Sequence, residues 1–162
     1  MSEVPMFIGV LVYIKRGNDY LMMHRVKKQN DMHEGLWVAP GGKRIRNESI
    51  IDCAKREVLE ETGLTTKTLT HLGFLHFPDD GHSPFHGEWV DFVFLCDDFE
   101  GEAFSECREG SLKWIPSEQM MHLSMWEGDA LFTPYVLSAT RFNAQLIYHG
   151  KNIYFSQIDA LP

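Results

Sequence analysis

The chain has 162 residues, 44% of them hydrophobic and 12% aromatic, and its formal net charge is −8. This length predicts one domain over residues 1–162, and the apolar content excludes a disordered chain. An acidic chain lacks the basic surface that binds the backbone of a long nucleic acid, so we expect no such partner. The charge is uneven, because residues 1–46 hold eight Lys and Arg against four Asp and Glu, whereas residues 47–162 hold seven against nineteen.

The cysteines and the apolar runs predict a cellular location. Cys53, Cys96 and Cys107 cannot all pair with one another, and none has a partner at metal-ligand spacing, which is typical of a reduced compartment. The apolar run at 6–14 is too short to cross a bilayer and lacks the pattern of a secretory leader. We therefore expect a cytoplasmic protein with no membrane partner, as a monomer or a homodimer.

The first part of the chain predicts a hairpin followed by a loop. The apolar and β-branched runs 7–14 and 20–24 flank Gly17-Asn18, which is typical turn chemistry. Residues 26–36 are polar and predict a loop. A short apolar piece, Trp37-Val38-Ala39, then ends at a Pro-Gly-Gly turn.

The clearest element is a helix over residues 49–63. Ser49 is a suitable N-cap, with Asp52 three residues later, and Gly63 occupies the position of a C-terminal glycine. An apolar stripe at helical spacing predicts the face that packs on the core, and its members are Ile51, Ala54 and Val58.

The remainder alternates strands with short helices, which predicts an α+β or α/β layered domain. The expected strands are 65–77, 89–96 and 112–115, with a loop at 78–82, and the expected helices are 117–121, entered through Pro116, and one within 128–140. Residues 142–148 and 152–157 predict a closing hairpin.

Three glutamates gather on one side of the predicted helix. At about 100° per residue, Glu57, Glu60 and Glu61 project into one arc of about 100°. Their mutual repulsion, and the position of two of them in the last helical turn, both disfavour this arrangement unless a cation compensates it. Oxygen ligands suit Mg²⁺ or Mn²⁺ better than Zn²⁺. The alternative from these residues alone is a solvated acidic face.

The spacing of the residues around these glutamates identifies the chain as a member of the Nudix hydrolase superfamily. The full signature of that superfamily lies in residues 42–64, and every fixed position is filled. The matching residues are Gly42, Glu48, Arg56, Glu57, Val58, Glu60, Glu61, Gly63 and Leu64.

The resemblance implies a fold and a reaction. Nudix proteins are α/β/α sandwiches around a mixed sheet, in which the motif forms a loop, a helix and a loop. They hydrolyse a nucleoside diphosphate linked to another group, and they use Mg²⁺ or Mn²⁺. By position, the metal ligands would be the carbonyl of Gly42 or Gly41 and the side chains of Glu57, Glu60 and Glu61.

The same resemblance implies roles for the neighbouring residues. Glu57 is the most frequent choice for the base that activates water, Arg56 would hold a glutamate in place, and Glu48 would steady the loop. Relatives often take a further acidic ligand from a downstream loop, where Glu109 precedes Trp114 by five residues. A surface glutamate is the alternative for Glu109.

Two segments outside the motif resemble MutT-type enzymes that act on oxidised nucleotides. Residues 35–43 resemble the entry to the motif in that group. Residues 125–129 resemble its base-recognition segment, in which Trp126 would stack on a purine and Asp129 would accept two hydrogen bonds from a guanine-like edge. The alternative for Trp126 is a core aromatic residue.

The purine pocket departs from the mammalian relatives at two positions. Val38 stands where they have an asparagine, and Gly128 replaces one of two adjacent acids. A small nucleotide is therefore the expected substrate, while a preference for oxidised purines stays open. Other nucleoside diphosphate derivatives, such as ADP-ribose or a nucleotide sugar, and a module that binds without cleaving are the alternatives.

The remaining polar residues of interest are basic side chains and histidines. Lys43 and Arg25 are candidates for contacts with the phosphates, because they border the motif or the loop before it. His82 and His86 fall in the loop after residue 77, and the histidines show no paired metal-binding spacing. We expect them to be surface histidines.

Overall fold

A mixed sheet of nine strands forms the centre of the computed structural model, which describes residues 3–162. The strands follow the order β3-β2-β1-β6-β5-β8-β9, with β4 paired to β1 and β7 paired to β2. In chain order the elements are β1 (Met6–Arg16), β2 (Asp19–His24), β3 (Trp37–Val38), β4 (Gly41–Lys43), α1 (Ile50–Thr62), β5 (Thr65–Phe77), β6 (Glu88–Glu100), β7 (Ser111–Pro116), the 3₁₀ helix η1 (Ser117–His122), α2 (Glu127–Leu137), β8 (Phe142–His149) and β9 (Asn152–Ala160).

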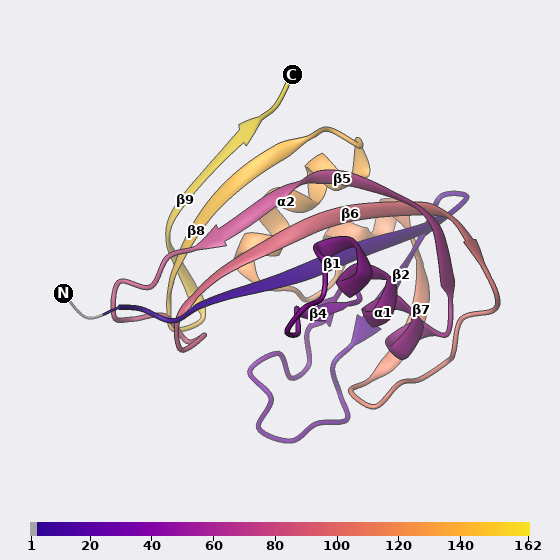
Figure 1. Cartoon of the computed structure of the whole chain (residues 1–162), viewed down its shortest axis with the longest axis horizontal. Coiled ribbons are helices and arrows are strands. Elements are labelled where there is room, and N and C mark those ends of the chain that lie inside the picture. The colour runs from indigo at the N-terminus through magenta and orange to yellow at the C-terminus, as the bar shows by residue number, and fades with distance from the viewer. Residues whose placement is uncertain (1–2) are drawn as a thin grey trace.

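Strand β1 buries both of its faces, and this divides the core into two parts. Successive side chains of a strand point to opposite faces of the sheet. Val12 and Ile14 therefore pack on one side, whereas Tyr13 packs on the other. Helix α1 covers the first side and α2 covers the second, as Figure 1 shows with α1 in front of the long strands and α2 behind them. The layered fold predicted from the sequence is confirmed.

Helix α1 begins and ends where the sequence predicts. The Ser49 hydroxyl accepts a hydrogen bond from the backbone N–H of Asp52 at 3.0 Å. Gly63 ends the helix with φ of 78°, a left-handed conformation that favours glycine, and its N–H donates to the Leu59 carbonyl.

The buried face of α1 differs from the predicted one at one position. Ala54 and Val58 are fully buried, but Ile51 is 42% exposed and Cys53 is buried in the core instead. The prediction that Ile51 packs inward is therefore wrong. Angular spacing defines the direction of a side chain, but it does not define how far along the helix the sheet continues to cover it.

The other predicted elements are confirmed, with two differences in detail. The first helix after β7 is a 3₁₀ helix, and Pro116 precedes it at the N-cap position rather than opening it. Helix α2 continues through Pro134. Within residues 3–162, no helix is long and apolar enough to span a membrane.

The register of β1 brings three segments together at the future site. Gly9 of β1 lies opposite Lys43 of β4 on one side and opposite Asp91 of β6 on the other. A side chain at position 9 would collide with the Asp91 carboxylate. Because Gly9 has no side chain, the Asp91 carboxylate can occupy the space beside it.

Candidate active site

Arg56 holds three acidic side chains, two from α1 and one from the loop before it. Its guanidinium donates to Glu48 through Nε at 2.6 Å and through Nη2 at 3.0 Å. Nη1 donates to Glu57 at 2.8 Å and to Glu60 at 3.2 Å. Arg56 also donates to the Lys43 carbonyl at 3.2 Å, so one side chain connects α1 to the loop before it and to β4.

Glu57 and Glu61 lie side by side against strand β4. The backbone N–H of Gly41 donates to Glu61 Oε2 at 3.3 Å, and a Cβ atom on Gly42 would stand only 2.5–2.8 Å from the Glu57 carboxylate. Burial, followed by the charges of Glu57 and Glu109, raises the pKa of Glu61 to about 9. Burial also raises the pKa of Glu57. The protein therefore does not place enough positive charge beside these two carboxylates to neutralise them.

Glu109 is held beside this group by Arg25. The guanidinium of Arg25 donates to Glu109 Oε2 and to Asp31 Oδ2, each at 2.8 Å. Glu109 is close enough to Glu61 for its charge to raise the pKa of that residue. We call Glu57, Glu60, Glu61 and Glu109 the carboxylate cluster. Glu60 is its most open member, with a side chain 59% exposed, whereas that of Glu57 is 13% exposed.

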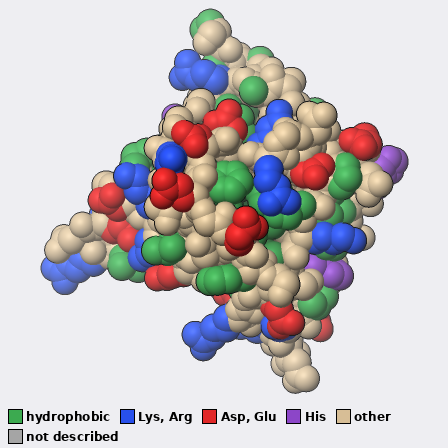
Figure 2. Space-filling model, turned by 90° about the vertical axis from the view of Figure 1, so that its right-hand side faces the viewer, with side chains coloured by type: hydrophobic (Ala, Val, Ile, Leu, Met, Phe, Trp, Pro, Cys, Tyr) green, Lys and Arg blue, Asp and Glu red, His purple; other side chains and the backbone are tan. Residues whose placement is uncertain are grey.

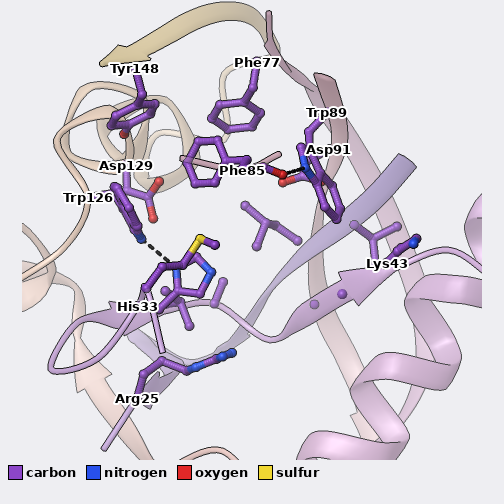
Figure 3. Close-up of a pocket in the computed structure, with 17 residues that line it drawn as sticks. Arg25, His33, Lys43, Phe77, Phe85, Trp89, Asp91, Trp126, Asp129 and Tyr148 are labelled. Atoms are coloured by element: carbon purple, nitrogen blue, oxygen red, sulfur yellow. Dashed lines mark hydrogen bonds between the residues drawn. The ribbon is translucent and has the colours of Figure 1, made fainter. Parts of the chain in front are cut away.

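A cavity of about 280 Å³ opens next to the carboxylate cluster. Aromatic side chains form much of its wall, and we call it the aromatic pocket (Figure 3). The Trp126 ring centroid lies 5.4 Å from that of Phe85 and 5.3 Å from that of Tyr148. Gly41, Gly42 and Lys43 line the other end, so strand β4 is common to the pocket and the cluster.

Trp126 is both a buried residue and a wall of the pocket. Its side chain is 6% exposed, and its Nε1–H donates to Nδ1 of His33 at 2.7 Å. Burial, followed by the charge of Arg25, lowers the pKa of His33, which keeps the ring neutral and able to accept this bond. The two alternatives for Trp126, core residue and pocket wall, are therefore compatible.

Two carboxylates point into the aromatic pocket from opposite sides, as Figure 3 shows for Asp129 and Asp91. Burial raises the pKa of each to about 7, and for Asp129 the charge of Asp91 contributes further. Asp91 was missed by the sequence reasoning. It lies within a predicted strand, and an acid in the middle of an apolar run was the one signal that could have indicated it.

The geometry around Gly128 explains why an acid is absent there. The Gly128 N–H donates to the hydroxyl of Tyr148 at 2.7 Å, and a Cβ at this position would stand 2.6 Å from that oxygen. The tyrosine hydroxyl thus occupies the space of a side chain. The second carboxylate of the pocket comes from β6 instead of from the segment after Trp126.

The structure brings the remaining predicted residues to the same region. Val38 lines the aromatic pocket, as do Lys43 and Arg25. The Lys43 ammonium lies 4.3 Å from the centroid of the Phe7 ring. Arg25 is only 13% exposed because Asp31 and Glu109 surround its guanidinium. Arg25 therefore already has two acidic partners beside the pocket.

One face of the molecule carries charges of both signs. On the face drawn in Figure 2, basic and acidic side chains are interspersed, with apolar side chains between them. That face presents no continuous basic stripe of the kind that a nucleic acid backbone requires.

Comparisons with known proteins identify the family of this chain. The NUDIX domain family model matches residues 5–136. An uncharacterised Nudix hydrolase of Bacillus subtilis is 32% identical over 127 residues, which cover 78% of this chain and 77% of that protein. The oxidized purine nucleoside triphosphate hydrolase of mouse is 34% identical over 130 residues, 80% of each chain.

A zebrafish (Danio rerio) protein of the same name as the mouse enzyme is 32% identical over 127 residues, 78% of each chain. Among solved structures, the MutT protein of Bacillus halodurans superposes with a TM-score of 0.83 and 28% identity, covering 94% of this chain and 97% of that one. The whole layered architecture is thus shared with a MutT protein. The chain belongs to the Nudix hydrolase family.

Proposed function

We propose that this Nudix hydrolase converts a purine nucleoside triphosphate, with oxidised guanine as the preferred base, to the monophosphate and pyrophosphate. The observation that carries the proposal is the shared strand β4, which joins a carboxylate cluster to an aromatic pocket lined by two acids. A nucleotide has two matching parts, because its flat base suits the aromatic pocket and its polyphosphate suits metal ions held by the carboxylate cluster.

The carboxylate cluster supports Mg²⁺ as the cofactor, with Mn²⁺ as a substitute. The side chains of Glu57, Glu60, Glu61 and Glu109, with the Gly42 carbonyl, would supply the hard oxygen ligands that Mg²⁺ prefers. The raised pKa values of Glu57 and Glu61 fit such a role, because a partly buried pair of acids is stabilised by a compensating cation. When bound, Mg²⁺ would neutralise the phosphates and lower the pKa of a water.

Glu57 is the proposed base that takes a proton from the attacking water. Its carboxylate is held by Arg56 at 2.8 Å and faces the Gly42 backbone, so its direction is set from two sides. Arg56 is a positioning residue in this scheme, because its donors are already engaged by acidic side chains and the Lys43 carbonyl. Glu48 in turn fixes Arg56.

The aromatic pocket supports recognition of a base that has hydrogen-bond donors on two edges. Guanine presents N–H groups on its Watson–Crick edge, and oxidation at C8 turns N7 from an acceptor into a donor. Asp129 on one wall and Asp91 on the other can accept bonds from these two edges, while Trp126 offers its ring for stacking. Val38 gives apolar contact only. The polyphosphate would extend along β4 toward Lys43 and Arg25.

A nucleotide panel tests this proposal. Purified protein with Mg²⁺ is assayed for phosphate release in the presence of inorganic pyrophosphatase, with 8-oxo-dGTP, dGTP, dATP and ADP-ribose as substrates. We expect the highest kcat/KM with 8-oxo-dGTP. A higher value with ADP-ribose would assign the enzyme to nucleoside diphosphate derivatives, and tight nucleotide binding without turnover would indicate a sensing module.

The role of the second carboxylate is tested separately. Asp91→Asn keeps the shape of the side chain and one acceptor oxygen but removes the negative charge. A hydrogen bond to a charged group contributes roughly 1 kcal/mol more than a neutral one, which corresponds to about 5–10-fold in kcat/KM. We expect this loss with 8-oxo-dGTP and a smaller loss with dGTP, which has no N–H at N7. Equal losses with both nucleotides would contradict the assignment of Asp91 to the oxidised edge.

A further inference from the structure

The loop between β5 and β6, residues 78–87, meets the turn between β8 and β9 at the rim of the aromatic pocket. The backbone N–H of Gly150 donates to the His82 carbonyl at 3.2 Å. Asp80, His82 and His149 each place one ligating atom within 4.8 Å of the others. We propose that these three side chains bind a Zn²⁺ ion, which fastens the loop to the turn.

The spacing of the three side chains suits a tetrahedral ion. Ligand atoms about 2.0–2.1 Å from such an ion lie roughly 3.3–3.4 Å from one another. Asp80 Oδ1 lies 3.5 Å from His82 Nδ1, and Asp80 Oδ2 lies 2.7 Å from His149 Nε2. The three ligating atoms, one from each residue, lie within 4.8 Å of one another, so small side-chain rotations would bring them to that separation. The exposed His82 side chain, 66% accessible, is free to make the remaining adjustment.

The ligand types select the kind of ion. Two imidazole nitrogens with one carboxylate suit Zn²⁺ and its neighbours in the first transition row, whereas Mg²⁺ prefers a shell of oxygens. Water would complete the coordination of a site with three protein ligands. This site is therefore chemically distinct from the carboxylate cluster, whose ligands are all oxygens.

His149 is already oriented for such a role. Its ring stacks on that of Tyr154 with a centroid distance of 4.0 Å and an interplanar angle of 8°. The His82 ring lies 4.5 Å away. The Nε2 atom of His149 lies 2.7 Å from Asp80 Oδ2, so these two proposed ligands already face each other. Less ordering is then required when the ion binds.

The position of the site connects it to nucleotide binding. Phe85 belongs to the same loop as Asp80 and His82, and its carbonyl accepts a hydrogen bond from Trp89 Nε1 at 3.2 Å. Its ring lies 5.4 Å from that of Trp126 and 5.5 Å from that of Tyr148. Tyr148 immediately precedes His149. An ion bound at the rim would thus tie together two walls of the aromatic pocket.

Calorimetry with Zn²⁺ alone as the titrant tests the site, with no nucleotide present. Excess Mg²⁺ in the cell competes with Zn²⁺ for the carboxylate cluster, whose ligands are all oxygens. We expect the wild-type chain to bind one Zn²⁺ at the rim and Asp80→Asn, His82→Asn and His149→Asn each to bind it at least about tenfold more weakly. Equal affinity in the wild type and all three variants, or no binding by the wild type, would overturn the site.

A matched control and a second measurement complete the test. His86 lies exposed in the same loop with φ of 56°, a conformation that asparagine tolerates, so His86→Asn should bind Zn²⁺ as the wild type does. Zn²⁺ should also slow hydrogen exchange of residues 78–87 in the wild type and not in His149→Asn. Zn²⁺ binding without that protection would overturn its role as a fastener of the loop.

Discussion

The guanidinium of Arg56 donates two hydrogen bonds to the carboxylate of Glu48, of 2.6 and 3.0 Å. This pair closes the loop before α1 onto the helix. Because Nη1 of the same guanidinium donates to Glu57 at 2.8 Å, Arg56 positions both the loop and the proposed base. Disturbing Glu48 should therefore affect both stability and catalysis.

Glu48→Gln should make the protein less sensitive to acid. The hydrogen bond from Arg56 lowers the pKa of Glu48 from 4.5 to about 2. A lowered folded-state pKa stabilises the protein above pH 4.5, and this contribution disappears as pH falls toward 2. The variant should thus have a lower urea midpoint than the wild type at pH 7, and the gap should narrow below pH 4.5. A gap that is constant with pH would contradict the ion pair.

Gly42→Ala and Gly41→Ala should have different consequences. A Cβ at position 42 meets the movable end of Glu57 at 2.5–2.8 Å, whereas one at position 41 collides with the backbone carbonyl of Val10. We expect the first variant to fold and to lose about 10²-fold in kcat, because the carboxylate is displaced. The second should lose roughly 1–3 kcal/mol of stability by overpacking. Thermal unfolding and steady-state kinetics distinguish the two. Full activity in Gly42→Ala would contradict the position assigned to Glu57.

Asp91→Asn and Asp129→Asn should stabilise the nucleotide-free protein at high pH. Burial raises the pKa of each acid from 3.8 to about 7, so the unfolded state ionises first as pH rises. Stability is therefore lost between these two values and is not regained above pH 7. Each variant should gain roughly 4 kcal/mol at pH 8 and little at pH 4, since one pKa unit corresponds to about 1.4 kcal/mol. Urea unfolding at both pH values measures this, and equal gains would exclude titration as the cause.

Glu57→Gln should reduce kcat by about 10²–10⁴, the usual contribution of a positioned base, while the fold is retained. Glutamine can still accept the hydrogen bond from Arg56, so the network around α1 should persist. Single-turnover kinetics and circular dichroism provide the two readouts. The exposed Glu102→Gln serves as the control and should match the wild type. A variant at position 57 with normal turnover would transfer the role of base to another glutamate.

Local rules were enough to predict α1 and its acidic edge. Ser49 and Gly63 act through backbone groups a few residues away, and Glu57 and Glu61 share a face because of helical geometry alone. The hairpins follow in the same way from turn residues, as at Gly17 between β1 and β2. Local rules do not say how far along α1 the sheet covers the helix. For this reason the prediction that Ile51 packs on the core was wrong.

The sequence by itself was enough to identify the family, through the spacing of the motif residues. It also predicted the order of the elements and the shared face of the motif carboxylates, because turns, caps and helical geometry depend on residues close together in the chain. Only the tertiary structure decided that Asp91 faces the pocket with Asp129, that Arg25 holds Glu109, and that His149 reaches Asp80. Such pairs depend on which strands become neighbours in the sheet. That order is set by burying two faces of β1 at once, a property of the whole fold rather than of any segment.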